Sequence, residues 1–352
     1  MIWLTWRQFR GSATMMAALL VTLITVLALT GPRLVSGYSA GIAACTQDGT
    51  CDRFFDRFFD EYQLPFMAVS LVVLILPALA GLFWGAPLIT RELEAGTHLL
   101  VWNQSVTRGR WLAVKLGLTG LAAMTAAGVC GLAVTWWSDP LDKSAVPDLA
   151  LMAPLVFGAR GIAPMGYAAF AFVLGVAVGM LVRRTLAAMA LTLAVFVAIQ
   201  LAMPLLVRPH LMPPVTAAFE LSKTNVDGIG VRNDETQLVH IGLDSAVPGH
   251  AGAWVLSSDL LDPSGRTISG SDTRGAVKTS TTSGPCAPPG AGGGQGMDGC
   301  LVEINRLGYR QQATYQPLER FWPFQWIETG IYTLLTVGLT WFCFWWVRRR
   351  LS

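Results

Sequence analysis

Six long apolar runs constrain this chain more than any other feature. Each has roughly 20 residues, the length that an α-helix needs to cross the hydrocarbon core of a bilayer, about 30 Å thick. Charged residues make up 13% of the chain, against about 25% in soluble domains. We therefore expect an all-α polytopic membrane protein with six transmembrane helices. The expected spans are Ser12–Thr30, Leu64–Ala86, Leu116–Trp136, Ala163–Val182, Leu186–Leu206 and Trp326–Val347.

The basic residues between the runs predict the orientation, because short cytoplasmic loops carry an excess of Lys and Arg. If the N-terminus is inside, every inside segment is basic, and both termini lie in the cytoplasm. The first run is longer than the apolar part of a signal peptide, so we expect it to be retained. The inside basic positions are Arg7, Arg10, the segment 87–115, Arg183, Arg184 and Arg348–Arg350.

Four of the six cysteines fall in segments that this orientation places outside, where disulfides persist. They form two local pairs, and their even number on one side argues against four free thiols. We predict the bridges Cys45–Cys51 and Cys286–Cys300.

The repeat in Cys51–Tyr62, CDRFFDRFFDEY, has the spacing of an amphipathic helix. We expect this helix either on the outer membrane surface or against the outer domain.

Residues 207–323 separate spans five and six and are predicted to form a small β-rich extracytoplasmic domain. Thr236–Leu243 and Ala253–Leu261 have strand composition, and Cys300–Pro317 is predicted to form two further short strands. The remaining domains are 1–206, with five spans and the cytoplasmic loop 87–115, and 324–352, with the sixth span and a basic tail.

Small residues recur within the spans, as in the pairs Gly81/Gly85 and Gly175/Gly179. Such residues permit close approach of helices in lipid. The approach can occur within the chain or at a dimer face, and the sequence leaves both open.

No run carries a catalytic or metal-ligating set of residues, and the net charge of +3 is too small to suggest a nucleic-acid partner. We therefore expect neither an enzyme nor a cofactor-binding chain. The polar candidates for a translocation surface, each of which could instead bond a backbone carbonyl, are Thr22, Thr25, Ser70 and Gln200.

The stretch Leu88–Leu100 has the periodicity of an amphipathic helix. Its polar face carries Arg91, Glu94, Thr97 and His98, whereas Glu92 falls inside the apolar arc. A buried carboxylate needs a partner. The basic residues on the same side that could provide one are Arg7, Arg10, Arg110 and Lys115.

The sequence Arg91–Lys115 resembles the cytoplasmic loop of bacterial ABC exporter permeases of the drug, sodium and polysaccharide exporter class. Tyr315–Tyr332 resembles the start of the last span in actinobacterial members. The long segment before that span departs from the family pattern of short outer loops. The matching loop positions are Arg91, Glu92, Glu94, Gly96, Thr97, Thr107, Arg108, Trp111, Leu112 and Lys115.

The resemblance implies a permease without an ATPase of its own, which moves an amphiphilic or apolar solute outward. It implies a homodimer with two ATP-binding subunits that carry ATP and Mg²⁺. The cytoplasmic loop would act as a coupling helix, and Glu92 would tie it to the N-terminal helix. The alternative is a membrane-anchored sensor or immunity protein whose outer domain binds a ligand. The implied ATPase-coupling residues are Arg91, Glu92, Glu94, Gly96, Thr97, His98 and Arg108.

Overall fold

The computed structural model describes two compact units. Unit 1 comprises Met1–Ser144, Pro154–Leu211 and Trp322–Ser352, and unit 2 comprises Ala145–Ala153 and Met212–Phe321. The described residues are 2–48, 51–96, 107–144, 149–231, 238–268, 274–279, 283–287 and 295–349.

Unit 1 is helical. Within the described residues, six helical stretches are long and apolar enough to cross a membrane, in agreement with the six expected spans. Its elements are α1 (Ile2–Asp48), α2 (Cys51–Leu79), the π-helical segment η1 (Ala80–Gly85), α3 (Ala86–Glu94), α5 (Arg108–Asp142), α6 (Pro154–Phe157), α7 (Ala163–Val182), α8 (Thr185–Ala202), η3 (Met203–Val207), η4 (Arg208–His210) and α10 (Phe321–Arg349).

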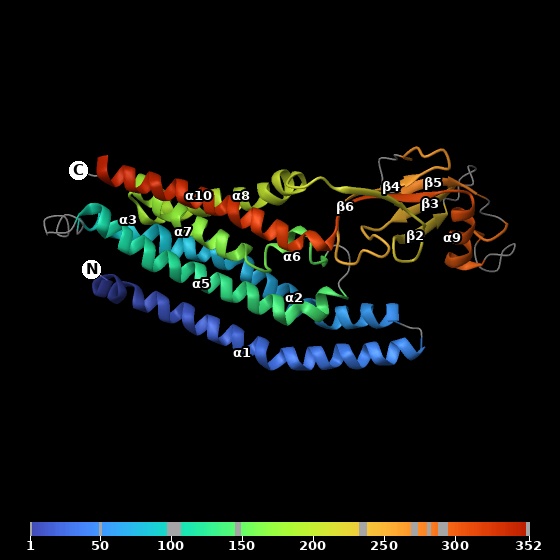
Figure 1. Cartoon of the computed structure of the whole chain (residues 1–352), viewed down its shortest axis with the longest axis horizontal. Coiled ribbons are helices and arrows are strands. Elements are labelled where there is room, and N and C mark those ends of the chain that lie inside the picture. Colours follow the sequence, from blue (N-terminus) through green and yellow to red (C-terminus); the bar gives the residue numbers. More distant parts are fainter. Residues whose placement is uncertain are drawn as a thin grey trace. The chain divides into compact units, whose positions relative to one another are not determined.

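Figure 1 shows that α1 begins, and α10 ends, at the end of unit 1 where α3 lies. We call this end the α3 end. The opposite end holds the end of α1, the beginning of α2 and the beginning of α10.

α7 is the central helix of unit 1. It packs against α2, η1, α3, α5 and α8, and 17 of its residues are buried. A helix that is apolar on all sides is stable only where neighbours surround it. The fourth span therefore forms the core on which the other helices assemble.

Glycines bring α7 into backbone contact with η1 and α3. A Cβ atom added at Gly175 would lie 2.4 Å from the carbonyl oxygen of Gly81, and one at Gly85 would lie 2.4 Å from that of Phe172. At Gly179 the nearest atom would be the carbonyl oxygen of Ala86, at 2.9 Å. These glycine pairs thus serve packing within the chain, and no dimer face is needed to explain them.

The DRFF repeat is the first part of α2 and packs on α1. The ring of Phe58 lies 5.6 Å from that of Tyr38, and Phe54 covers Gly41, which has no side chain to block it. We expected a helix on the outer membrane surface or against the outer domain; the aromatic face instead pairs with the extension of α1 beyond Thr30. The end of α1 and the beginning of α2 can extend side by side, because this contact covers their aromatic side chains.

The disulfide Cys45–Cys51 joins the end of α1 to the beginning of α2. The second predicted bridge, Cys286–Cys300, is also present and lies in unit 2. The two remaining cysteines, Cys130 and Cys343, are buried thiols.

Unit 2 contains two three-stranded antiparallel sheets. The predicted strands at Thr236–Leu243 and Ala253–Leu261 are confirmed as β3 and β4. One sheet has the order β1-β6-β4 and the other β2-β3-β5. The elements are β1 (Val215–Phe219), β2 (Val226–Val231), β3 (Leu238–Leu243), β4 (Trp254–Leu261), β5 (Arg274–Lys278), α9 (Gly296–Arg306), β6 (Arg310–Gln316) and η5 (Leu318–Arg320).

The prediction of two strands within Cys300–Pro317 is wrong in its first half. That half belongs to α9, and only the second half forms a strand, β6. Cys300, Leu301 and Ile304 are buried together on one face of α9. A short apolar run has too few residues for its period to distinguish a helix from a strand, and the packing of this face decides for the helix.

We predict that Gly175→Ala destabilises the protein by roughly 1–3 kcal/mol, the usual result of forcing an extra methyl group into a packed core. The methyl group would meet backbone atoms, which cannot turn aside. Thermal unfolding in detergent measures the effect. Gly117→Ala is the matched control, because a Cβ there meets nothing within 4 Å. Equal unfolding temperatures for the two variants would contradict the packing described above.

Candidate functional site

α3 is the continuation of the second span and not a separate amphipathic helix. η1 joins it to α2, and it ends at Glu94, followed by Gly96 with a φ of 67°. The expected helix Leu88–Leu100 is helical as far as Glu94 and turns at Gly96, whose left-handed backbone is typical of a helix end. Its last four positions, 97–100, lie outside the described residues. Two of the expected coupling residues, Thr97 and His98, lie outside the described residues.

Lys115 of α5 is a partner of Glu92. The Lys115 ammonium donates a hydrogen bond to the Glu92 carboxylate, and the exposed fractions of the two side chains are 5% and 14%. The same ammonium lies 4.9 Å from the centre of the Trp111 ring. The prediction that Glu92 needs a basic partner is thus confirmed, and Lys115 is one of the four candidates. The expected tie between Glu92 and the N-terminal helix stays a prediction. Of its two candidates there, Arg10 is exposed, and nothing is described of the Arg7 side chain.

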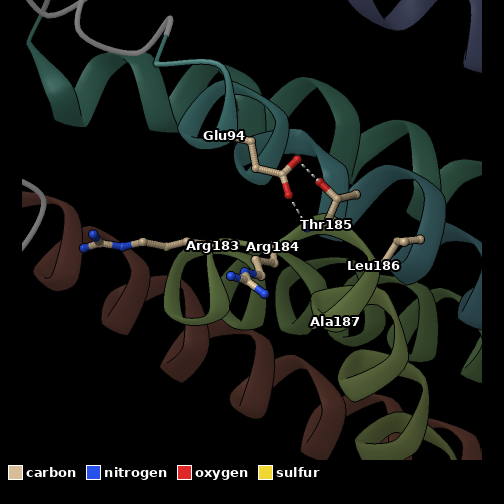
Figure 2. Close-up of a pocket in the computed structure, with 6 residues that line it drawn as sticks. All are labelled: Glu94, Arg183, Arg184, Thr185, Leu186 and Ala187. Carbon is tan, nitrogen blue, oxygen red and sulfur yellow. Dashed lines mark hydrogen bonds between the residues drawn. The ribbon is translucent and has the colours of Figure 1, made fainter.

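Glu94 bonds to the first residue of α8 (Figure 2). Its Oε1 accepts a hydrogen bond from the Thr185 amide at 2.7 Å, and its Oε2 accepts one from the Thr185 hydroxyl at 2.8 Å. The resemblance implies that Glu94 is a coupling residue, and this stays a prediction. Its side chain is exposed, and its carboxylate bonds within the same chain. The neighbouring Arg91 is exposed.

A surface pocket of about 700 Å³ lies beside this contact. The side chains of Arg183 and Arg184, in the turn between α7 and α8, are exposed. Arg183 has a φ of 57° and is the only non-glycine residue with a positive φ in the described part of the chain. Its amide bonds to the Gly179 carbonyl, which closes α7. The pocket is lined by Glu94, Arg183, Arg184, Thr185, Leu186 and Ala187.

The remaining coupling candidate, Arg108, is partly exposed in the first turn of α5. That helix begins where Thr107 caps it, with the Thr107 hydroxyl accepting a hydrogen bond from the Arg110 amide at 3.4 Å. This cap explains why the helix starts at Arg108, directly after Thr107.

The four polar candidates for a translocation surface are not gathered at one place. Thr22 and Thr25 are exposed on α1 and bond to carbonyls one turn earlier. Ser70 is buried and accepts a hydrogen bond from Arg160, and Gln200 accepts one from Tyr332. Their role in translocation stays a prediction.

Sequence reasoning missed a buried ion pair at the end of unit 1 opposite the α3 end. Arg208 and Glu328 are 2% and 0% exposed. The guanidinium donates two hydrogen bonds to the carboxylate, at 2.9 and 3.0 Å, and lies 4.2 Å from the centre of the Phe157 ring. Tyr167 also donates to Glu328, at 2.5 Å. The signal in the sequence is Glu328, an acid near the start of the sixth expected span, Trp326–Val347.

A second buried pair was also missed. Arg160 is fully buried, and its Nη2 lies 3.6 Å from Oδ1 of Asp142. Arg160 also donates to Ser70 at 3.2 Å and lies 4.8 Å from the centre of the Phe66 ring. Buried charges are stable only when paired. This pair therefore fixes the end of α5 and the beginning of α7 to α2.

The described residues contain no group of three or more side chains that could hold a metal ion.

Comparison with known proteins decides the family. The family described as ABC-2 membrane transporter related matches residues 17–208, more than half of the 352 residues. The chain belongs to this family. No curated protein matches the chain, and no solved structure does.

Membership of the ABC-2 family makes the chain a multi-pass membrane component of an ABC transporter, and it implies a partner ATPase subunit. The match covers α3, α5, α7 and α8, with the contacts of Glu92 and Glu94. It leaves out almost all of unit 2 and the whole of α10.

We predict that Glu92→Leu and Lys115→Met each destabilise the protein by about 3 kcal/mol, the usual effect of removing one member of a buried ion pair. The double variant Glu92→Leu/Lys115→Met should recover most of this loss, because no buried charge remains. Unfolding free energies in detergent give the double-mutant cycle. Additive losses in the double variant would contradict a direct pair.

Proposed function

We propose that this chain is the permease subunit of an ABC exporter and that its partner ATPase docks at α3. The observation that carries the proposal is the different direction of the charged side chains in Arg91–Glu94, the sequence RELE. Glu92 and Glu94 fix α3 to α5 and α8, whereas Arg91 between them remains exposed. A short helix that is bonded to two neighbouring helices and has a third, exposed face can transmit a displacement of that face to both neighbours.

The α3 end is the cytoplasmic side in this proposal. Arg10 near the beginning of α1, Arg183 and Arg184 between α7 and α8, and Arg349 at the end of α10 are exposed there with Arg91. A concentration of basic residues at one end of the spans favours that end as the inside. An ATPase in the cytoplasm would meet α3 on this side.

Unit 2 is extracytoplasmic in this proposal. Most of it, Met212–Phe321, follows α8 and precedes α10 in the sequence. The end of α8 and the beginning of α10 both lie at the end of unit 1 opposite the α3 end. The disulfide Cys45–Cys51 lies at that same end of unit 1, and Cys286–Cys300 lies within unit 2. Disulfides are typical of the oxidising side of a bacterial membrane.

Two copies of the permease, each presenting one α3, would serve two copies of the ATPase, which carry ATP and Mg²⁺. The apolar side chains along α1 are largely exposed, for example Met15 at 77% and Leu29 at 70%. Such a surface suits contact with lipid or with a second permease. The apolar spans favour an amphiphilic or apolar solute as the exported substrate.

We predict that the partner ATPase purifies with the wild-type chain and that Arg91→Glu reduces the amount recovered at least severalfold. The reversed charge would repel the acidic side chains that an exposed arginine selects. Quantitative pull-down from membranes measures the ratio of ATPase to permease. Arg33→Glu is the matched control, since Arg33 is exposed and lies in the second half of α1, a helix that begins at the α3 end and ends at the opposite end. If the wild-type chain purifies without an ATPase, the proposal fails and the sensor alternative gains support.

We also predict that a membrane-impermeant maleimide labels Ser245→Cys in intact cells but labels Ala95→Cys only after the membrane is opened. Both positions are exposed, so the side of the membrane on which each lies decides whether the reagent reaches it. The unsubstituted chain is the control, because its two free thiols are buried. The reverse labelling pattern would invert the proposed orientation.

A further inference from the structure

We infer that Glu94 is a positioning residue that joins α3 and the beginning of α8 into one rigid element, so that movement of α3 carries the fourth and fifth spans with it. The link itself follows from contacts within this chain. Its consequence for transport rests on the proposed docking of an ATPase at α3.

Thr185 is held from two positions of α3. The Glu94 carboxylate accepts hydrogen bonds from both the amide and the hydroxyl of Thr185. The Thr90 hydroxyl lies 2.9 Å from the Thr185 hydroxyl. Thr90 and Glu94 are four residues apart, so they lie on the same side of α3, one turn from each other. Two successive turns of α3 therefore hold the first residue of α8.

The beginning of α8 needs this acceptor. The first amides of a helix have no partner within the helix, and a side chain at the cap position usually provides one. Arg184 stands at that position and makes no capping hydrogen bond among the described residues. Glu94 provides the acceptor from another helix, and its negative charge lies at the positive end of the helix dipole. Separation of α8 from α3 would leave the Thr185 amide without this bond.

The contact continues along α7. Gly179 brings α7 against Ala86 and Thr90, since a Cβ there would lie 3.0 Å from the Thr90 methyl group. Only Arg183 and Arg184 separate α7 from α8. Thr90 is thus in contact with both helices, and α3, the end of α7 and the beginning of α8 form one block.

Glu92, the other acid in this segment, bonds to a different helix. Glu92 and Glu94 are two residues apart and so point to nearly opposite sides of α3. Glu92 bonds to Lys115 of α5, at the start of the third span. Because the Glu92 contact is buried and the Glu94 contact is exposed, only the second can be broken without disturbing the core. Glu94 therefore offers a direct test.

The test measures the distance between spin labels on α3 and α8. Ala95→Cys and Leu186→Cys place the labels at exposed positions on the two helices. The doubly labelled chain, in lipid nanodiscs, should give one narrow distance distribution. Glu94→Ala should broaden it and add a longer distance, whereas Thr185→Ser, which keeps the amide and the hydroxyl, should leave it narrow. Glu61→Gln is the matched control, because Glu61 is an exposed acid in the first half of α2, which begins at the end opposite α3. An unchanged distribution in Glu94→Ala would overturn the inference.

A second arm uses the complex with the partner ATPase. In the wild-type chain the distance between the labels should be the same in the nucleotide-free and ATP-bound states, because both helices move together. With Glu94→Ala it should change with nucleotide. A nucleotide-dependent change in the wild-type chain would overturn the inference while the docking proposal stands. Failure of the ATPase to bind would overturn the docking proposal, and the first arm would still decide whether Glu94 joins the two helices.

Discussion

The backbone contact between α7 and the segment η1–α3 is the constraint on which the rest of unit 1 depends. Gly81, Gly85 and Gly175 let these two segments of the chain approach until the carbonyl oxygens of one lie against the glycine α-carbons of the other. This approach puts Thr90 against Gly179 and brings Glu94 to the beginning of α8. In a lipid environment helices gain little from burying apolar surface, so close packing through small residues supplies much of the association. The position of α3 and its contact with α8 therefore depend on a contact in the interior.

The two ends of unit 1 use charge in opposite ways. At the α3 end most arginines are exposed, and the acids Glu92 and Glu94 bond to neighbouring helices. At the other end Arg160 and Arg208 are buried and paired with acids. A buried pair resists separation because each charge alone would be costly in a low dielectric. One end is thus fixed internally, while the other has charged side chains on its surface.

Family membership and structure support different parts of the functional account. The ABC-2 match makes the chain a membrane component of an ABC transporter, but it does not assign roles to side chains. The structure gives Glu92 and Glu94 partners on two different spans, which makes α3 a connection between helices as well as an exposed surface. Export, docking and the outer location of unit 2 stay proposals that this arrangement supports.

The sequence by itself determined the six spans, both disulfides, the strands β3 and β4 and the need of Glu92 for a basic partner. Each follows from local composition, length or spacing. Tertiary structure alone decided that Cys300 begins a buried helical face, that the helix after the second span stops at Glu94, and that Arg208 is the partner of Glu328. It also decided that Glu94 accepts a hydrogen bond from the first amide of α8, because that amide lies 91 residues away in the chain and only folding brings the two together.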